Sequence, residues 1–278
     1  MSPIVYYSSI FIFYIVDLLI KKTSANLSEW KYIFQRSIYS AFFSVILALL
    51  INQFYPLPTI SILLQLAACS FICGFGFLFY IKALKILNFS NIGALGVMAT
   101  INQQLMAVFI IGEKNSPSYW FAFCLMLVAF FIQAKKTTKL KGLLWILLSS
   151  IFWPLGYVLL SIVLKHTQVF WSIPVMEITL LIISFIGLIF SKNKIESIII
   201  HKKDNIYFII IAILTIGGSL LNNLSFKEIK ISNLGIFQLS LVPLYYFISM
   251  KLFNEKPTKT EVISLLLSLC GLFVFYFW

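Results

Sequence analysis

The feature that most constrains the fold of this chain is a succession of ten apolar segments separated by short polar connections. The segments lie near residues 4–20, 33–51, 59–81, 92–111, 118–134, 142–163, 172–190, 205–224, 233–252 and 261–277. About 20 apolar residues in a helix cross the hydrocarbon core of a bilayer. Only helices and closed β-barrels satisfy the backbone in lipid, and these segments are longer than a barrel strand. The sequence therefore predicts an all-α integral membrane protein with ten transmembrane helices.

The composition excludes a soluble enzyme and a nucleic-acid-binding protein. Hydrophobic residues make up 61% of the 278 residues and charged residues 11%, whereas a soluble domain has about 45–50% and 25%. The net charge of +12 is distributed over the short connections, where lysines orient a chain in the membrane. We therefore expect membrane lipids and a small-molecule substrate as partners, no nucleic acid, a monomer or homodimer, and a location in a bacterial inner (plasma) membrane.

The two halves of the chain share residues at a constant offset of 142 positions. The matching pairs are Lys85 and Lys227, Ser90 and Ser232, Asn91 and Asn233, Gly93 and Gly235, Glu113 and Glu255, and Lys114 and Lys256. Each half then holds five spans, and an odd number makes the second half enter the membrane in the opposite orientation. We therefore predict two inverted five-helix repeats, residues 1–137 and 138–278. Inverted repeats are typical of secondary transporters that work by alternating access.

The repeated motifs resemble those of the drug/metabolite transporter superfamily, in its EamA-like branch. They are Tyr80-Ile81-Lys82-Ala83-Leu84, Ser90-Asn91 and Gly112-Glu113-Lys114 in the first half, and Leu224-Ser225-Phe226, Ser232-Asn233 and Asn254-Glu255-Lys256 in the second. The resemblance covers essentially the whole chain and implies a five-plus-five arrangement of helices. The sequence departs from the family pattern because the first helix lacks a tryptophan-glycine pair, Asn254 replaces a glycine and Ser225 replaces an alanine.

The distribution of lysines and the family resemblance predict opposite orientations in the membrane. Most lysines lie in the odd-numbered connections, such as the one around Lys139. The positive-inside rule places these connections in the cytoplasm and both termini outside. The resemblance implies the reverse, with cytoplasmic termini.

Two carboxylates within the spans are candidates for function. Asp17 lies in the first span and Glu177 in the seventh. A charge at the bilayer centre costs about 2.5–3.5 kcal/mol on insertion scales, so such residues mark functional sites by default. Either carboxylate could bind a cationic group or carry a proton, although Asp17 could instead pair with Lys21, one helical turn away. Glu177 corresponds, within one residue of the offset, to Arg36, and the two could form a gate pair or extend to opposite membrane surfaces.

Amides and aromatic side chains complete the predicted site. Three consecutive amides, residues 102–104, lie at the centre of the fourth span, and Pro243 precedes two tyrosines at the corresponding depth of the ninth. We predict a broken or bent helix at Pro243 and a cavity lined by amides and tyrosines, the alternative being hydrogen bonds between helices. Trp153 and Tyr157 could line the same cavity or anchor the sixth span at the interface. The predicted substrate-binding residues are Tyr14, Asp17, Asn102, Gln103, Trp153, Tyr157, Glu177, Asn222, Gln238, Tyr245 and Tyr246.

The sequence contains no pattern that indicates a cofactor, a metal site or an ATP-binding loop. We expect no enzymatic activity and interpret the chain as a secondary transporter of a small polar or amphipathic metabolite, such as an amino acid or an amine. Proton coupling is one option for its energy source. The alternatives are a membrane-embedded enzyme, or a channel or scaffold without transport activity. Glu113 and Glu255, at the ends of the fourth and ninth spans, are expected to be structural and to satisfy helix ends and turn amides.

Overall fold

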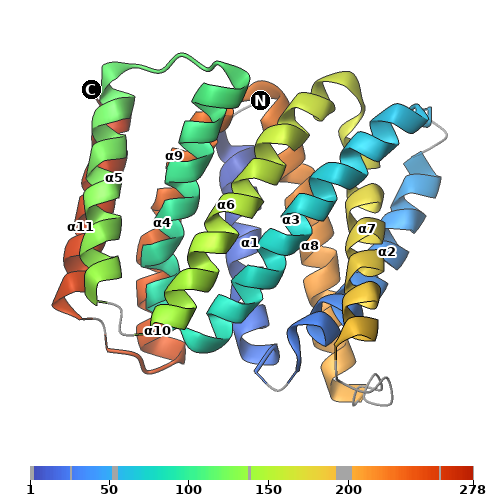
Figure 1. The fold of residues 1–278 in the computed structure, drawn as a ribbon, viewed down its shortest axis with the longest axis horizontal. Coiled ribbons are helices and arrows are strands. Elements are labelled where there is room, and N and C mark those ends of the chain that lie inside the picture. The colour runs from blue at the N-terminus through green and yellow to red at the C-terminus, as the bar shows by residue number, and fades with distance from the viewer. Residues whose placement is uncertain are drawn as a thin grey trace. The chain divides into compact units, whose positions relative to one another are not determined.

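A computed structural model describes residues 3–25, 27–51, 56–136, 139–191, 202–256 and 258–277 (Figure 1). The helices are α1 (Pro3–Thr23), α2 (Glu29–Ile51), α3 (Ile60–Ile86), α4 (Phe89–Met106), α5 (Pro117–Lys136), α6 (Leu140–Val163), α7 (Val169–Phe190), α8 (Lys202–Glu228), α9 (Ile231–Phe237), α10 (Val242–Leu252) and α11 (Lys259–Phe277). The π-helical turn η1 (Ala107–Ile111) continues α4, the 3₁₀ turn η2 (Leu164–His166) continues α6, and the 3₁₀ turn η4 (Gln238–Leu241) joins α9 to α10.

The prediction of an all-α protein with ten spans is confirmed for the described part of the chain. Ten helical runs there are long and apolar enough to cross a membrane, and α9, η4 and α10 together make one of them, Ile231–Leu252. The ninth span was predicted to be broken or bent, and it is broken: the 3₁₀ turn η4 separates α9 from α10 shortly before Pro243. Proline lacks the backbone N–H that a continuous helix would use at this point. Pro154, by contrast, lies inside the uninterrupted helix α6.

The chain forms two compact units, and each unit combines segments from both halves of the sequence. The first unit comprises Met1–Leu78 and Leu159–Glu228, and the second comprises Phe79–Val158 and Ile229–Trp278. Helices α3 and α6 each contribute to both units. The units are defined by contacts in space, whereas the predicted repeats are defined by matching residues in the sequence. The boundaries of the units and of the repeats therefore need not coincide.

The first unit is built by close approach of α1 to α8 and of α2 to α7. Small residues allow this approach: the Ser9 hydroxyl donates to the Gly218 carbonyl at 2.9 Å, and the Trp30 ring lies where a side chain on Gly187 would be. Helices in lipid associate through such close packing, because lipid chains are as apolar as the helix surfaces. The contact of Trp30 with Gly187, together with the contact of Arg36 with Glu177, shows that α2 and α7 run antiparallel.

The second unit is organised around α4, which packs against α5, α9, α10 and α11. Twelve of its eighteen residues are buried, on all sides of the helix. A helix without an exposed face is an interior helix, so the polar residues at its centre are enclosed by protein. Helices α5 and α11 lie side by side and form the second main pair of this unit (Figure 1).

Candidate substrate site

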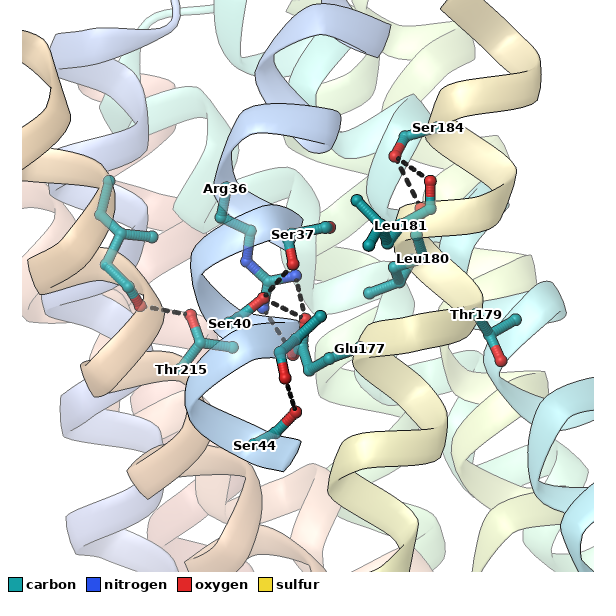
Figure 2. A network of polar contacts seen from close by, with 12 residues as sticks. Arg36, Ser37, Ser40, Ser44, Glu177, Thr179, Leu180, Leu181, Ser184 and Thr215 are labelled. Carbon is teal, nitrogen blue, oxygen red and sulfur yellow. Dashed lines mark hydrogen bonds and ion pairs between the residues drawn. The ribbon is translucent and has the colours of Figure 1, made fainter. Parts of the chain in front are cut away.

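A buried ion pair between α2 and α7 is the most conspicuous polar feature of the first unit. The two terminal nitrogens of Arg36 donate to the two carboxylate oxygens of Glu177, each at 2.8 Å. The Ser40 hydroxyl donates to Oε2 of the same carboxylate at 2.6 Å. Figure 2 shows Arg36 and Ser40 reaching from α2 toward Glu177 on α7. The carboxylate therefore accepts three hydrogen bonds, all from α2.

The pair is enclosed and lies well inside its two spans. Arg36 is 4% exposed and Glu177 3% exposed, and the ring of Phe77 lies 5.5 Å from the guanidinium carbon. Arg36 is the eighth residue of α2 and Glu177 the ninth of α7, and the helices are antiparallel. The alternative in which the two side chains extend to opposite membrane surfaces therefore does not hold. An ion pair at this depth is a functional candidate by default.

The other predicted residues of the first unit lie on α1 and α8. Tyr14 is buried, and Asp17 is partly exposed. Tyr32 of α2 interacts electrostatically with both Asp17 and Arg36. Asn222 is buried.

The polar residues predicted on α4 are engaged with neighbouring helices. The Asn102 amide donates to the Ser150 carbonyl of α6 at 2.8 Å, and the Gln103 amide donates to the Ile231 carbonyl of α9 at 2.8 Å. These bonds match the alternative in which the amides connect helices. They leave each amide oxygen as the group that a substrate could still use.

Gln104 is a candidate that the predicted set omitted. It is fully buried in α4, and among the described residues neither its amide nitrogen nor its amide oxygen has a hydrogen-bond partner. The π-helical turn η1 begins three residues later, and such turns are frequent at functional sites. The sequence signal for Gln104 was the run of three amides, but the run does not show which amide is left without a partner.

Tyrosines and tryptophan of the second unit are held by aromatic and backbone contacts. The Tyr246 hydroxyl donates to the Glu261 carbonyl at 2.8 Å, and the Tyr245 ring lies 4.8 Å from that of Phe89. Trp153 packs edge-on against Tyr157 at 6.2 Å. Gln238 lies in η4 and is partly exposed. The structure thus places Tyr14, Asp17, Glu177 and Asn222 in the first unit, and Asn102, Gln103, Trp153, Tyr157, Gln238, Tyr245 and Tyr246 in the second.

Glu113 caps a helix of the opposite half of the chain. Its carboxylate accepts hydrogen bonds from the backbone N–H groups of Ile231 at 2.9 Å and Ser232 at 3.1 Å, and from the Ser232 hydroxyl at 2.5 Å. These N–H groups open α9, where a helix has no internal acceptors for them. The predicted structural role of Glu113 is confirmed.

Glu255 does the same at the start of α4. Its carboxylate accepts from the backbone N–H groups of Phe89 at 3.0 Å and Ser90 at 3.3 Å. The Ser90 and Ser249 hydroxyls also donate to it. The predicted structural role of Glu255 is likewise confirmed. The glutamate of the Glu-Lys motif in each half therefore caps a helix of the other half.

Ten apolar spans and a charged pair enclosed between two of them define an integral membrane protein with a polar interior. Comparison with known families narrows this class: residues 140–277 match the sequence model of the EamA-like transporter family. Over this half of its length the chain belongs to the EamA-like transporter family, and the predicted resemblance is confirmed. The protein is accordingly a membrane transporter of small molecules that resides in lipid. The family is one of transporters, which agrees with the expectation that the protein is not an enzyme.

The fold is shared with proteins of known structure. A solved structure titled "Crystal structure of protein" is similar over 96% of this chain and 96% of its own, with a TM-score of 0.69 and 14% sequence identity. At this identity the likeness concerns the fold alone. No curated protein gives a significant match to this chain.

Proposed function

We propose that the protein is a secondary transporter that moves a small polar or amphipathic metabolite across a bacterial inner membrane by alternating access between two inverted repeats. The observation that carries this proposal is a set of contacts in the second unit that exchange when residue numbers are shifted by 142. Three independent groups of contacts follow this rule.

The carboxylate caps form the first group. Glu113 binds the start of α9 at Ser232, and Glu255, its counterpart in the second half, binds the start of α4 at Ser90. Ser90 and Ser232 are themselves counterparts. Each half of the chain therefore caps a helix of the other half with the same residue types.

The second group is formed by two glycines and the side chains that they face. A Cβ on Gly93 would lie 2.6 Å from Cβ of Tyr245, and a Cβ on Gly235 would lie 3.7 Å from the Gln103 amide carbon. Gly93 corresponds to Gly235 and Gln103 to Tyr245. Gln103 of α4 thus faces Gly235 of α9 in the same way that Tyr245 of α10 faces Gly93 of α4.

The third group joins α5 to α11. A Cβ on Gly271 would lie 3.3 Å from the Ala122 carbonyl, and the Ser264 hydroxyl donates to the Ala129 carbonyl at 3.0 Å. Ser264 corresponds to Ala122, and Gly271 corresponds to Ala129. This third exchange involves a different pair of helices from the first two groups.

Reciprocal contacts of this kind are the mark of a two-fold axis, in which residue i contacts j and the counterpart of j contacts the counterpart of i. The end of α4 meets the start of α9, and the end of α10 meets the start of α4, so the paired spans are antiparallel. An axis that exchanges antiparallel membrane helices lies across them, in the membrane plane. These contacts support an inverted repeat, and a chain with such a repeat can adopt two related states by exchanging the roles of its halves.

Protons are the coupling ions that we propose, with Asp17 as the carboxylate that carries them. Glu177 accepts three hydrogen bonds, two of them from a guanidinium, so its carboxylate is already engaged. Asp17 is partly exposed and lies close to Lys21 and Lys22 at the end of α1, and we propose that it exchanges a proton with water from that end of the span. Proton carriers of pumps and transporters are carboxylates in such positions.

A metabolite exchange assay tests the proposal. The purified protein is reconstituted into liposomes loaded with a bacterial metabolite extract, and mass spectrometry follows which compounds cross the membrane with and without a pH gradient. We expect saturable exchange of a small set of polar compounds, faster with the gradient in the wild type than in Asp17→Asn. Lys251→Leu, an exposed change on α10, is the matched control. Flux that does not saturate would indicate a channel, chemically altered compounds would indicate an enzyme, and absence of exchange would contradict transport.

A further inference from the structure

We infer that Arg36 and Ser40 form a binding site for the carboxylate of the transported compound, and that Glu177 occupies this site when no substrate is bound. The inference rests on the proposed transport function and deepens it by naming the chemical class of the substrate: a compound that carries both a carboxylate and an ammonium group.

The first argument is that the carboxylate receptor is complete without α7. Both hydrogen bonds from the guanidinium and the bond from the hydroxyl come from α2, through Arg36 and Ser40, at 2.6–2.8 Å. Glu177 contributes only the carboxylate that fills the receptor. A planar guanidinium fork matches any carboxylate in this two-pronged geometry, so a carboxylate of a substrate fits the same three donors.

The second argument is that the guanidinium has more N–H donors than Glu177 uses. Arginine offers five N–H donors, and Glu177 takes one from each terminal nitrogen. The Phe77 ring lies 5.5 Å from the guanidinium carbon and offers no hydrogen-bond acceptor of the usual kind. The neighbouring Ser37 hydroxyl is buried without a partner in the described part of the chain. An unpaired hydroxyl in an enclosed site is costly, and a polar group of a substrate or of water would satisfy it.

The third argument concerns which ligand could displace Glu177 without leaving a charge unpaired. A carboxylate on Arg36 releases Glu177, whose charge then needs a partner in a site that is almost fully enclosed. An uncompensated buried charge is strongly unfavourable. A substrate with an ammonium group next to its carboxylate supplies that partner, whereas a simple carboxylate does not. A simple amine offers nothing to Arg36 and cannot displace Glu177 from it.

Matched sets of compounds test this ranking on the purified full-length protein. Each set contains an amino acid, the amine that lacks its carboxylate and the acid that lacks its ammonium group: leucine, 3-methylbutylamine and 4-methylpentanoate, with corresponding sets built on alanine and phenylalanine. Binding is measured by calorimetry and thermal shift in detergent. We expect at least one amino acid to bind about tenfold or more tightly than both of its partners. Amines that bind as tightly as the amino acids, or no binding by any carboxylate, would overturn the inference.

Two variants separate a substrate site from a merely structural ion pair. Glu177→Gln removes the competing charge, so we expect the affinity for the simple acid to rise about tenfold relative to the amino acid. Arg36→Lys keeps the charge and loses the fork, so we expect carboxylate binding to fall about tenfold or more. A structural pair predicts lower thermal stability in both variants and no change in the ranking of the three compounds. Ser40→Ala serves if Glu177→Gln does not fold, with a smaller expected loss of carboxylate affinity, and Lys251→Leu is the control.

The outcomes distinguish this inference from the transport proposal. A protein that exchanges only compounds without a carboxylate is a transporter, and the inference about Arg36 is then wrong. A protein that binds carboxylates through Arg36 but exchanges no metabolite supports the site and contradicts transport.

Discussion

At the scale of single residues, the ion pair of Arg36 and Glu177 contributes little net stability, although its bonds are short. Removing two charges from water costs several kcal/mol per ion, and their attraction only roughly repays this cost. The pair is therefore better explained by what it can bind than by what it stabilises. Its two members depend on each other, because either charge alone would be buried without compensation.

This dependence gives a prediction on stability. Arg36→Met should lower the free energy of unfolding by about 3–5 kcal/mol, because it leaves the Glu177 charge unpaired, whereas Arg36→Met with Glu177→Met should be about neutral. Thermal unfolding in detergent measures both, with Lys251→Met as an exposed control. If the double variant loses as much stability as the single variant or more, the pair stabilises the fold and this reading is wrong.

The three amides of α4 show why neighbouring residues in a helix have different roles. Successive side chains point about 100° apart, so Asn102 faces α6, Gln103 faces α9 and Gln104 points where the described structure offers no partner. The sequence shows three equivalent amides, and only their directions in the packed unit separate them.

At the scale of helices, the two repeat-related glycines differ in the room that they leave for a side chain. A Cβ on Gly93 would lie 2.6 Å from Cβ of Tyr245, which is held close to the α10 backbone and cannot swing aside. A Cβ on Gly235 would meet Thr100 at 3.4 Å, an ordinary van der Waals contact. The approach of α4 to α10 therefore depends on glycine at position 93, whereas the approach of α9 to α4 leaves room for a Cβ at position 235.

Alanine at each glycine tests this difference. We expect Gly93→Ala to destabilise the protein by about 1–3 kcal/mol, as other substitutions that overpack a core do, and Gly235→Ala to leave stability nearly unchanged. Thermal unfolding of the two variants makes the comparison, and each serves as the control for the other. Equal losses would show that the repeat-related contacts are equally tight.

At the scale of the whole molecule, charge is unevenly distributed between the two ends of the second unit. Exposed lysines lie in the last turn of α5, directly before α6 and in the first turn of α6, at positions 135, 139 and 141, whereas Lys114 precedes the start of α5. Glu255 and Glu261, at the lysine-rich end, turn their carboxylates inward to cap helices. The outward-facing charge at this end is therefore positive.

The positive-inside rule gives a prediction on orientation. In a cysteine-free background, Lys139→Cys should react with a membrane-impermeant maleimide only after the cells are permeabilised, and Lys114→Cys should react in intact cells. Lys139 lies directly before α6 and Lys114 three residues before α5, and both are exposed, so they are matched in accessibility. The reverse pattern would agree with the orientation that the family resemblance implies, and would show that other features override the lysines.

The sequence alone determined the class of structure, the number of spans and the helix break before Pro243. These follow from local properties: twenty apolar residues must form a helix in lipid, and proline cannot donate a backbone hydrogen bond. It also indicated Arg36 and Glu177 as related charges, and Glu113 and Glu255 as structural residues, because the repeat links their positions.

Only the tertiary structure decided which of these residues meet. Arg36 and Glu177 are 141 positions apart and form two hydrogen bonds, and Glu113 caps a helix that starts 118 positions later. A polar residue within an apolar span is expected to be enclosed by protein, but the sequence does not show which helices enclose it. Partners across helices depend on how the helices cross and how closely their small residues allow them to approach. In lipid that choice is made by packing between helices, since apolar surfaces gain little by leaving the lipid.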